Sequence, residues 1–348
     1  MNSKKFISIV RWYHKQMFSF DKKQNYHMLP LEAMKEAWYD CELFVIDSQV
    51  KVEEDPNFVS WVNVVYYKSF LHYIRYLFTN RNNLLYSNSL TIKTLLVWMI
   101  AKKSVFMAHD QAFPTSGKAI KQYIVRFFYR FFSAIRVINT GEHTLLEKKW
   151  IEAYTLPLAL SDGFYSTNTT KKDMTFIGNL YADKNPEFLL DALSDVIALF
   201  PDIKLHIYGE DRYNKDWKNF QTIINDHWLH DVVIIHGFVP HAQLKKALSE
   251  SLIYINTSLS EWQCLAVYEA ALSWCMLCLQ NILSFPSVFE TNALYHDTPT
   301  ELANNIIAIM RDTAYYSSIV KHNQEMILQN YSYEHIKQQT KEMFLHYA

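Results

Sequence analysis

Residues 174–209 read MTFIGNLYADKNPEFLLDALSDVIALFPDIKLHIYG, and this stretch decides the fold. It opens with an apolar run, Met174–Ile177, and a glycine, and it closes with a second apolar run, Lys204–Tyr208, and another glycine. Between the two runs, Asn185-Pro186 places a capping residue before a proline at the first helical position. Apolar residues then recur at helical spacing up to Phe200. The pattern predicts a strand, a helix and a second strand.

The same alternation of short apolar runs and helical patterns continues on both sides of this unit. Strands are expected at Lys5–Val10, Glu42–Ile46, Leu84–Tyr86, Ser104–Ala108, Ile135–Asn139, Val232–His236 and Leu252–Asn256. Helices are expected at Leu29–Trp38, Val64–Phe78, Leu90–Lys102, Glu142–Lys149, Pro299–Arg311 and Tyr333–Tyr347. Strands that alternate with helices are typical of α/β proteins with parallel sheets.

The length of 348 residues is enough for two domains. A polar segment, Ser161–Asp173, is the best candidate for a linker. We therefore expect a first domain at 1–160, a linker at 161–173 and a second domain at 174–332, with the helix at about 333–347 packed back on the first domain. Two doubly wound α/β domains of this size are expected to face each other across a cleft and to hold a ligand there, at the carboxyl ends of the strands.

The composition excludes several classes of protein. Half of the residues are hydrophobic and 20% are charged, which is incompatible with intrinsic disorder. The 4 cysteines are too few and too clustered for a disulfide scaffold, so a reducing compartment is expected. Cys275 and Cys278 lie in an apolar run that is more typical of a buried strand than of a metal site. We expect no signal peptide and no spanning helix.

Charge is distributed unevenly between the halves. Residues 1–170 have 21 Lys and Arg against 14 Asp and Glu, whereas residues 171–348 have 13 against 21. The basic excess concentrates in an aromatic-rich segment, and its cations facing a membrane would be Lys118, Lys121, Arg126 and Arg130. Such a segment is typical of a helix lying on anionic lipid, and equally of a helix packed on a sheet with solvated cations. A pI near 6.9 argues against a nucleic-acid partner.

Four segments of the second half follow expected strands and contain groups suited to a phosphorylated, hydroxyl-rich ligand. The first runs from Gly178 to Lys184, where a cation before a helix amino terminus suits a diphosphate. A lysine that is simply solvated in a connecting loop would give the same sequence pattern. The second and third each begin with a glycine after a strand, Gly209 and Gly237, which permits close backbone approach or simply makes a turn.

The fourth segment begins and ends with a glutamate, Glu261 and Glu269, and has seven residues between them. A carboxylate accepts hydrogen bonds from two neighbouring sugar hydroxyls at once. In the first half, His109 follows an expected strand, where an imidazole can bond a sugar hydroxyl, although a lone histidine is more often structural. No pair of side chains recurs at metal-ligand spacing, so no metal and no other cofactor is expected.

In this order, the segments resemble a retaining glycosyltransferase of the GT-B fold, from the large family 4 (glycosyl transferases group 1). The resemblance covers nearly the whole chain and is strongest from Met174 to Gln280. It implies that Lys184 holds the donor diphosphate, that Glu269 binds the ribose hydroxyls and that Glu261 binds the transferred sugar. It also implies that His109 faces the reacting sugar. The implied donor-binding residues are Gly178, Asn179, Lys184, Gly209, Arg212, Gly237, Phe238, Gln263, Cys264, Leu265 and Glu269.

The chain departs from the family pattern at two places. The family usually has arginine directly after the glycine of the phosphate loop, where this chain has Asn179, so one cation is missing. The glycines that the family has after the first glutamate are replaced by Trp262, Gln263 and Cys264. Both departures keep a catalytically inactive sugar-nucleotide binder or partner subunit open as an alternative.

The expected function is transfer of a sugar from a nucleotide-sugar donor to a hydroxyl of a glycan or lipid-linked acceptor, with retention at the anomeric carbon. Assembly of a cell-surface polysaccharide or glycolipid is the expected context. The location expected for such an enzyme is cytoplasmic, either free or peripheral on the cytoplasmic face of the membrane. A sugar-nucleotide epimerase on the same fold is a further alternative.

Overall fold

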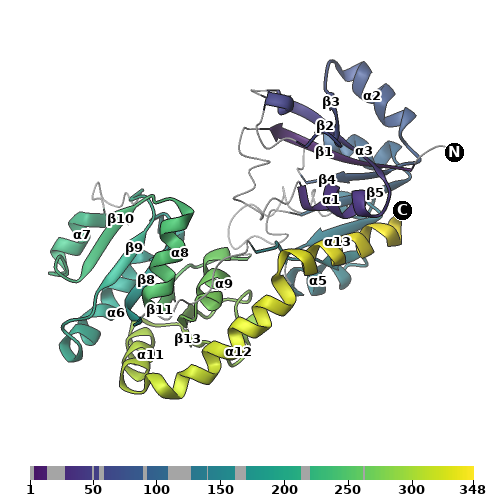
Figure 1. The fold of residues 1–348 in the computed structure, drawn as a ribbon. Coiled ribbons are helices and arrows are strands. Elements are labelled where there is room, and N and C mark those ends of the chain that lie inside the picture. The colour runs from purple at the N-terminus through teal and green to yellow at the C-terminus, as the bar shows by residue number, and fades with distance from the viewer. Residues whose placement is uncertain are drawn as a thin grey trace. The chain divides into compact units, whose positions relative to one another are not determined.

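The structure is a computed structural model. It describes residues 4–13, 28–48, 51–54, 59–88, 92–108, 127–138, 140–160, 170–212, 220–261 and 263–348. The chain forms two compact units, one of Met1–Ser161 with Tyr331–Ala348 and one of Asp162–Asn330 (Figure 1). The expected linker, 161–173, begins at this boundary, and its last two residues already lie in a strand of the second unit.

The first unit contains a seven-stranded parallel sheet in the order β3-β2-β1-β4-β5-β6-β7. Its strands are β1 (Lys5–Tyr13), β2 (Asp40–Ser48), β3 (Asn63–Tyr66), β4 (Leu84–Ser87), β5 (Lys103–Met107), β6 (Ala134–Val137) and β7 (Ala153–Thr155). The strand order reverses between β1 and β4, where Phe6 lies opposite Leu84. This reversal is the switch point at which doubly wound sheets bind ligands.

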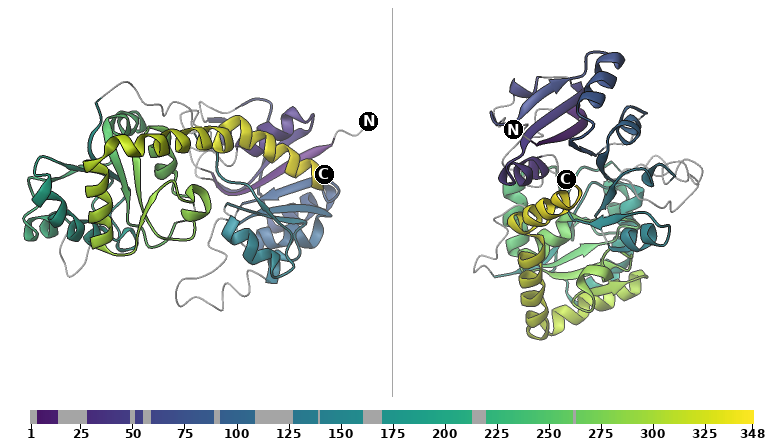
Figure 2. Two further views of the ribbon diagram at one scale, coloured as in Figure 1. Left: turned by 90° about the horizontal axis from the view of Figure 1, so that it is seen from below. Right: turned by 90° about the vertical axis from the view of Figure 1, so that its right-hand side faces the viewer.

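Helices cover both faces of this sheet. They are α1 (Met28–Glu36), α2 (Phe70–Thr79), α3 (Ile92–Ile100), α5 (Thr140–Glu147) and α13 (Tyr333–Tyr347), with a 3₁₀ turn, η1, at Val52–Glu54. Phe6 of β1 faces α13, and its ring centroid lies 4.8 Å from that of Phe344. Successive side chains of a strand point to opposite faces of the sheet. Ile7 faces the opposite side and packs in one cluster with Tyr73 and Leu77 of α2. The last helix of the chain therefore completes the core of the first unit (Figure 2).

The second unit contains a six-stranded parallel sheet in the order β10-β9-β8-β11-β12-β13. Its strands are β8 (Lys172–Ile177), β9 (Leu205–Tyr208), β10 (Val233–Gly237), β11 (Ser251–Asn256), β12 (Met276–Gln280) and β13 (Leu294–His296). Its helices are η2 (Ala182–Lys184), α6 (Pro186–Leu199), α7 (Phe220–Asp226), α8 (His241–Glu250), α9 (Leu265–Leu272), α10 (Pro286–Phe289), α11 (Pro299–Arg311) and α12 (Thr313–Tyr331). The prediction of two doubly wound α/β domains is confirmed.

The sequence prediction is wrong in part at one helix. Residues 64–66, expected as the first turn of a helix, belong to strand β3, which pairs with β2. The helix begins only at Phe70, because the hydroxyl of Ser69 accepts a hydrogen bond from the His72 backbone at 3.2 Å and caps it. The two neighbouring valines in β3 favour an extended backbone.

A half-buried lysine closes the amino-terminal edge of the second sheet. The Nζ atom of Lys171 donates to the carbonyl oxygens of Leu248, Ser249, Ser251 and Ser273, at 2.7–3.2 Å. These carbonyls belong to the carboxyl ends of α8 and α9, where helices leave acceptors unsatisfied. Burial lowers the pKa of Lys171, and the nearby Cys275 opposes this effect in part. Lys171 therefore ties two helix ends together before β8 begins.

Four turns that lead from a helix into a strand share one unusual feature. Their residue in the left-handed conformation is a tryptophan: Trp38 (φ 64°), Trp150 (φ 58°), Trp228 (φ 59°) and Trp274 (φ 62°). In each turn the tryptophan N–H bonds the carbonyl three residues back, and the next N–H bonds the carbonyl five residues back. This pair of hydrogen bonds is the Schellman motif, in which glycine is the usual left-handed residue.

Candidate functional site

The four segments singled out in the sequence lie at one edge of the second sheet. Gly178 follows β8, Gly209 follows β9, Phe238 follows β10, and Glu261 lies in the loop after β11. Because all these strands are parallel, their carboxyl ends lie at the same edge. Gly178 and the loop after β11 flank the switch point between β8 and β11, the place where doubly wound sheets bind ligands.

The glycines let three neighbouring strand ends approach closely. The Gly178 N–H bonds the Tyr208 carbonyl, and the Gly209 N–H bonds the Gly237 carbonyl, each at 2.9 Å. A Cβ atom added at Gly209 would lie 2.0 Å from the Gly178 carbonyl oxygen, so no other residue fits there. Gly237 has room for a side chain but has a left-handed φ of 69°. The two glycines are thus required for different reasons, contact at Gly209 and conformation at Gly237.

Asn179, at the position where the family has a cation, holds two loops together. Its side-chain oxygen accepts a hydrogen bond from the Glu210 backbone N–H at 2.9 Å. The Leu180 N–H in turn bonds the Glu210 carbonyl at 3.0 Å. The loops after β8 and β9 are therefore joined on both sides of Glu210. Asn179 therefore fixes the position of the loop after β9 relative to the loop after β8, and it adds no charge to this edge of the sheet.

Lys184 and Glu261 form an ion pair across the switch point. Their loops are also joined through the backbone, since the Thr257 hydroxyl donates to the Lys184 carbonyl at 2.8 Å and the Leu259 N–H to the Asp183 carbonyl at 2.9 Å. Burial by itself lowers the pKa of Lys184, but the neighbouring Glu261 carboxylate more than reverses this, so the pKa lies above its ordinary value. Lys184 is therefore a fixed cation at this edge.

Arg212, the second expected cation, is already paired within its own loop. Its guanidinium forms an ion pair with Glu210. Its Nη1 atom donates to the Tyr181 hydroxyl at 2.9 Å. Both contacts raise the pKa of Arg212, the hydrogen bond to Glu210 most of all. The arginine lies at the expected edge, with part of its charge neutralised by Glu210.

Glu269, the second glutamate of the motif, is buried inside α9. Its Oε1 atom lies 3.2 Å from the Nε2 atom of His241, in the first turn of α8. His241 was not among the residues predicted for the site. The signal that could have found it is its position directly after Pro240, at the start of the helix that follows β10. Glu269 and His241 place an acceptor and a ring nitrogen side by side near the ends of β10 and β11.

The amino terminus of α9 lies between the two glutamates. Cys264 is its N-cap residue, and Leu265 is the first helical residue. The first turn has no acidic residue, so the positive end of the helix dipole is not offset there. Burial raises the pKa of the Cys264 thiol to about 12, which keeps it uncharged. This helix start, with Gln263 before it, is suited to an anionic ligand.

Several predicted residues lie outside the described part of the chain. They are His109, Lys118, Lys121 and Arg126. Of the expected membrane-facing cations, Arg130 is described and exposed. Near it, Phe127 and Phe131 are half-exposed, whereas Tyr129 and Phe132 pack against Phe106 in the core. The described end of this segment therefore has one side packed in the core and one side exposed, and contact with a membrane stays a prediction.

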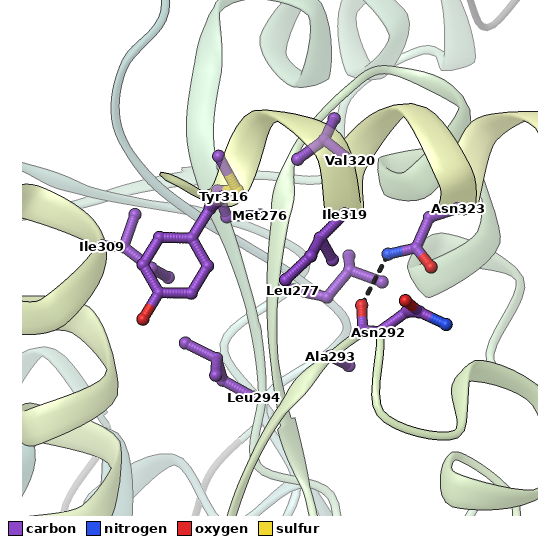
Figure 3. Close-up of a pocket in the computed structure, with 10 residues that line it drawn as sticks. All are labelled: Met276, Leu277, Asn292, Ala293, Leu294, Ile309, Tyr316, Ile319, Val320 and Asn323. Carbon is purple, nitrogen blue, oxygen red and sulfur yellow. Dashed lines mark hydrogen bonds between the residues drawn. The ribbon is translucent and has the colours of Figure 1, made fainter. Parts of the chain in front are cut away.

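Three further features of the described residues bear on a metal, a membrane span or a buried ligand. Among them no group of three or more His, Cys, Asp or Glu side chains is placed to hold a metal ion. No described helix is long and apolar enough to cross a membrane. A hollow beneath α12, bounded by Tyr316 and Asn323, has a volume of about 10 Å³, which has room for no more than a water molecule (Figure 3).

The fold matches solved structures over nearly the whole chain. Anabaena HepE in complex with UDP and glucose has a TM-score of 0.77 and 15% identity, with 98% of this chain and 100% of that chain covered. A glycosyltransferase from Rickettsia africae has a TM-score of 0.75 and 14% identity, with 99% of each chain covered. Two doubly wound sheets in this arrangement along the chain define the GT-B class of glycosyltransferase folds.

Residues 162–334 match the family model described as glycosyl transferases group 1, which confirms the resemblance to this family. A phosphatidylinositol N-acetylglucosaminyltransferase subunit of Arabidopsis thaliana is 28% identical over 95 residues, 27% of this chain and 21% of that protein. The GPI3 subunit of the same transferase in Saccharomyces cerevisiae is 24% identical over 144 residues, 40% of this chain and 31% of that protein. The chain thus matches a fifth to a third of these relatives. The family match and the fold together support the assignment of this chain as a glycosyltransferase.

Proposed function

We propose that the chain is a retaining glycosyltransferase that moves a sugar from a nucleotide-sugar donor to a hydroxyl of a glycan or lipid-linked acceptor. The observation that carries this proposal is the Lys184–Glu261 pair beside the helix start at Cys264. A fixed cation and a helix amino terminus both favour the negative charge that develops on a departing diphosphate. A carboxylate beside them can accept hydrogen bonds from sugar hydroxyls.

The proposed roles divide along the sheet edge. Lys184 and the α9 amino terminus bind the diphosphate and stabilise it as it leaves. Glu261 exchanges its bond to Lys184 for hydroxyls of the transferred sugar. Glu269, oriented by His241, accepts the ribose hydroxyls. In this mechanism the leaving phosphate takes the proton of the acceptor hydroxyl on the face that it vacates, which retains the anomeric configuration and requires neither a carboxylate base nor a metal.

A thermal-shift series with UDP, GDP, ADP and CMP and their sugar conjugates tests the donor site. At about 100 times its dissociation constant a ligand adds roughly 2.7 kcal/mol of stability. We expect one nucleotide to raise Tm and Glu269→Gln to abolish the rise. Glu250→Gln, on the exposed end of α8, is the matched control and should leave the shift unchanged. No shift with any nucleotide would contradict the proposal.

Transfer itself is measured next, with the donor that gives the shift. Proton NMR of the product reports the anomeric configuration, and retention is expected. A donor that binds and is never consumed would favour the inactive binding subunit, for which Asn179 is the supporting observation, because its amide replaces a cation and bonds Glu210. Conversion of the donor sugar without any acceptor would favour the epimerase.

For the acceptor, we propose a glycan or lipid-linked glycan used in cell-surface polysaccharide or glycolipid assembly, at the cytoplasmic face of a membrane. The basic, aromatic composition of residues 118–136 supports a membrane-proximal acceptor. Arg130 and the half-exposed Phe127 and Phe131 are the described part of that segment. Arg126→Ala with Arg130→Ala should weaken co-sedimentation with anionic vesicles, and unchanged binding would remove this support.

A further inference from the structure

Helix α2 of the first unit has large apolar side chains on its outward face as well as on its inward one. Tyr73 and Leu77 are fully buried against the sheet. On the opposite side, Leu71 is 62% and Phe78 is 53% exposed, and the outward-facing residue between them is Arg75. Two large apolar side chains are thus exposed beside one cation, and exposed apolar side chains that gather on one face often mark a contact site. The outward face of α2 therefore has the character of a contact surface.

The stretch of sequence that contains α2 and α3 has no acidic residue. From Pro56 to His109 the sequence has no Asp or Glu. The cations in that stretch are Lys68, Arg75, Arg81, Lys93, Lys102 and Lys103. Glu42, which accepts a hydrogen bond from Tyr76 of α2, is only 4% exposed and does not reach this surface. Met99, on the adjoining α3, adds a further side chain that is 63% exposed.

We propose that the outward face of α2, with Met99 of α3, docks on an anionic lipid bilayer. Exposed Leu, Phe and Met side chains enter the boundary between headgroups and acyl chains, while Arg75 and Arg81 meet anionic headgroups. Cations in a stretch of sequence without acids, beside exposed apolar side chains, favour this partner over a neutral surface. The inference goes beyond the proposed transfer reaction and does not depend on it.

Vesicle co-sedimentation tests the docking face. Wild type should bind phosphatidylcholine vesicles containing phosphatidylglycerol at least tenfold more tightly than phosphatidylcholine alone, and salt should weaken the binding. Leu71→Ser with Phe78→Ser should reduce binding tenfold or more. The matched control Leu199→Ser, which alters an equally exposed leucine on α6, should not change it. Circular dichroism checks that each variant folds.

Three results would overturn the docking proposal. They are no vesicle binding by wild type, equal binding by the double variant, and a wild-type dimer in solution that the double variant abolishes. The last would make the face a contact between two copies of the chain. Nucleotide-induced thermal shifts report the donor site separately, so loss of docking and loss of the proposed function are distinguishable.

A second inference rests on the four tryptophans in left-handed turns. Only a few per cent of non-glycine residues have a positive φ, so about 0.2 of the seven described tryptophans would be expected to have one. Four of them do. Packing offers no compensation at three of the four, because Trp38, Trp150 and Trp228 are 92%, 96% and 83% exposed, whereas Trp274 is 40% exposed. The other described non-glycine residues with positive φ are polar: Asp173, Asn185 and Glu290. The chain also has only 6 glycines, where average usage predicts about 24.

We infer that glycine is the residue that the native host inserts at these four positions. A single codon explains the pattern. UGA is read as tryptophan in some organisms and as glycine in others, so a gene translated with the first code shows tryptophan where a host with the second code inserts glycine. Trp262 fits the same explanation, since the group 1 family has glycine directly after the first glutamate. Trp262 lies outside the described residues, and for it alone the inference rests on the proposed function, in which the neighbouring Glu261 binds the transferred sugar.

Peptide mass spectrometry of the protein purified from its native host tests this directly. Glycine masses at positions 38, 150, 228 and 274 are expected, and UGA should stand at all four codons. Tryptophan masses, or UGG at all four codons, would overturn the inference. Neither readout depends on catalysis, so the proposed function is tested separately.

A recombinant chain gives an independent physical test. Trp228→Gly relieves a left-handed bulky residue that makes almost no contacts, and should raise Tm by roughly 2–8 °C. Trp61→Gly is the control for loss of a tryptophan as such, because Trp61 is a half-buried tryptophan without a positive φ. It should leave Tm unchanged or lower it. A fall in Tm for Trp228→Gly would contradict the inference.

Discussion

Lys171 and Lys184 stand at opposite ends of strand β8, and the protein uses the same side chain in two ways. Lys171 donates to four backbone carbonyls, and burial lowers its pKa. Lys184 meets a carboxylate, Glu261, and its pKa is raised. Backbone carbonyls cannot move away, whereas a carboxylate side chain can turn toward a ligand. The comparison separates a structural cation at the amino edge of the sheet from a cation available for binding at the carboxyl edge.

Replacing Lys184 gives the largest expected effect on this comparison. Lys184→Ala removes the fixed cation proposed to stabilise the departing diphosphate, and should lower kcat by about 10²–10³, or roughly 2.7–4 kcal/mol. Steady-state transfer assays with the identified donor measure it. The control Lys246→Ala, an exposed lysine that pairs with Glu250 along α8, should leave kcat unchanged. A Lys184→Ala enzyme as active as wild type would assign both lysines to structure.

Lys171→Met should instead lower stability, by about 3 kcal/mol, because it removes the donor shared by the Ser249 and Ser273 carbonyls at two helix ends. Urea unfolding measures the loss. Lys172→Met, the adjacent exposed lysine in β8, is the matched control and should unfold as wild type does. The comparison fails if Lys171→Met folds with undiminished stability.

His296, at the carboxyl end of β13, is a third titratable side chain of the second unit to set beside the two lysines. Burial lowers its pKa to about 4, and its side chain is 1% exposed. Between pH 6.5 and 4 the unfolded chain binds more protons than the folded one, so stability present above pH 6.5 is lost as pH falls. The loss approaches about 3 kcal/mol. Unfolding from pH 7.5 to 4 should show this slope, and His296→Phe should flatten it. The exposed His230→Gln should not.

Replacing Asn179 has the smallest expected effect on stability. It tests whether a residue at the carboxyl edge of the sheet is structural or binds the donor. Asn179 lies at the carboxyl edge, yet its partner is a backbone N–H, as in a structural role. Asn179→Ala should cost about 1 kcal/mol of stability. Asn179→Asp keeps the acceptor oxygen and should cost less. Donor affinity should change little in both variants, and a tenfold loss in Asn179→Asp would place Asn179 in the donor site itself. Chemical denaturation and nucleotide titration measure the two quantities.

Much of the fold follows from local pattern. The apolar runs and the Asn185-Pro186 helix start predict strands and helices that the structure contains. Residues 64–66 were misassigned because apolar residues in a short run fit a helix or a strand equally well, and pairing with β2 decides between them. Helix α12 was not expected, because its apolar residues form no continuous stripe.

The candidate site was predicted less completely than the fold. Lys184 and Glu261 were found because glycine, lysine and glutamate follow strands in a recognisable order. His241 was missed because its contact with Glu269 joins residues from different helices, which no local spacing reveals. The role of Asn179 also depends on a distant backbone N–H, that of Glu210. Contacts between strand ends are a property of the sheet and emerge only when it has formed.

Helix α13 has a consequence for the order in which the protein is made. It packs Phe344 against Phe6 and Tyr86 of the first unit, although all of Asp162–Asn330 precedes it in the chain. Domains usually fold as units while they emerge from the ribosome, the first before the second. Here the first unit must wait for residues translated after the second unit, with Phe6 and Tyr86 uncovered by α13 throughout. The second unit, continuous in the chain, is the one that can finish folding during synthesis.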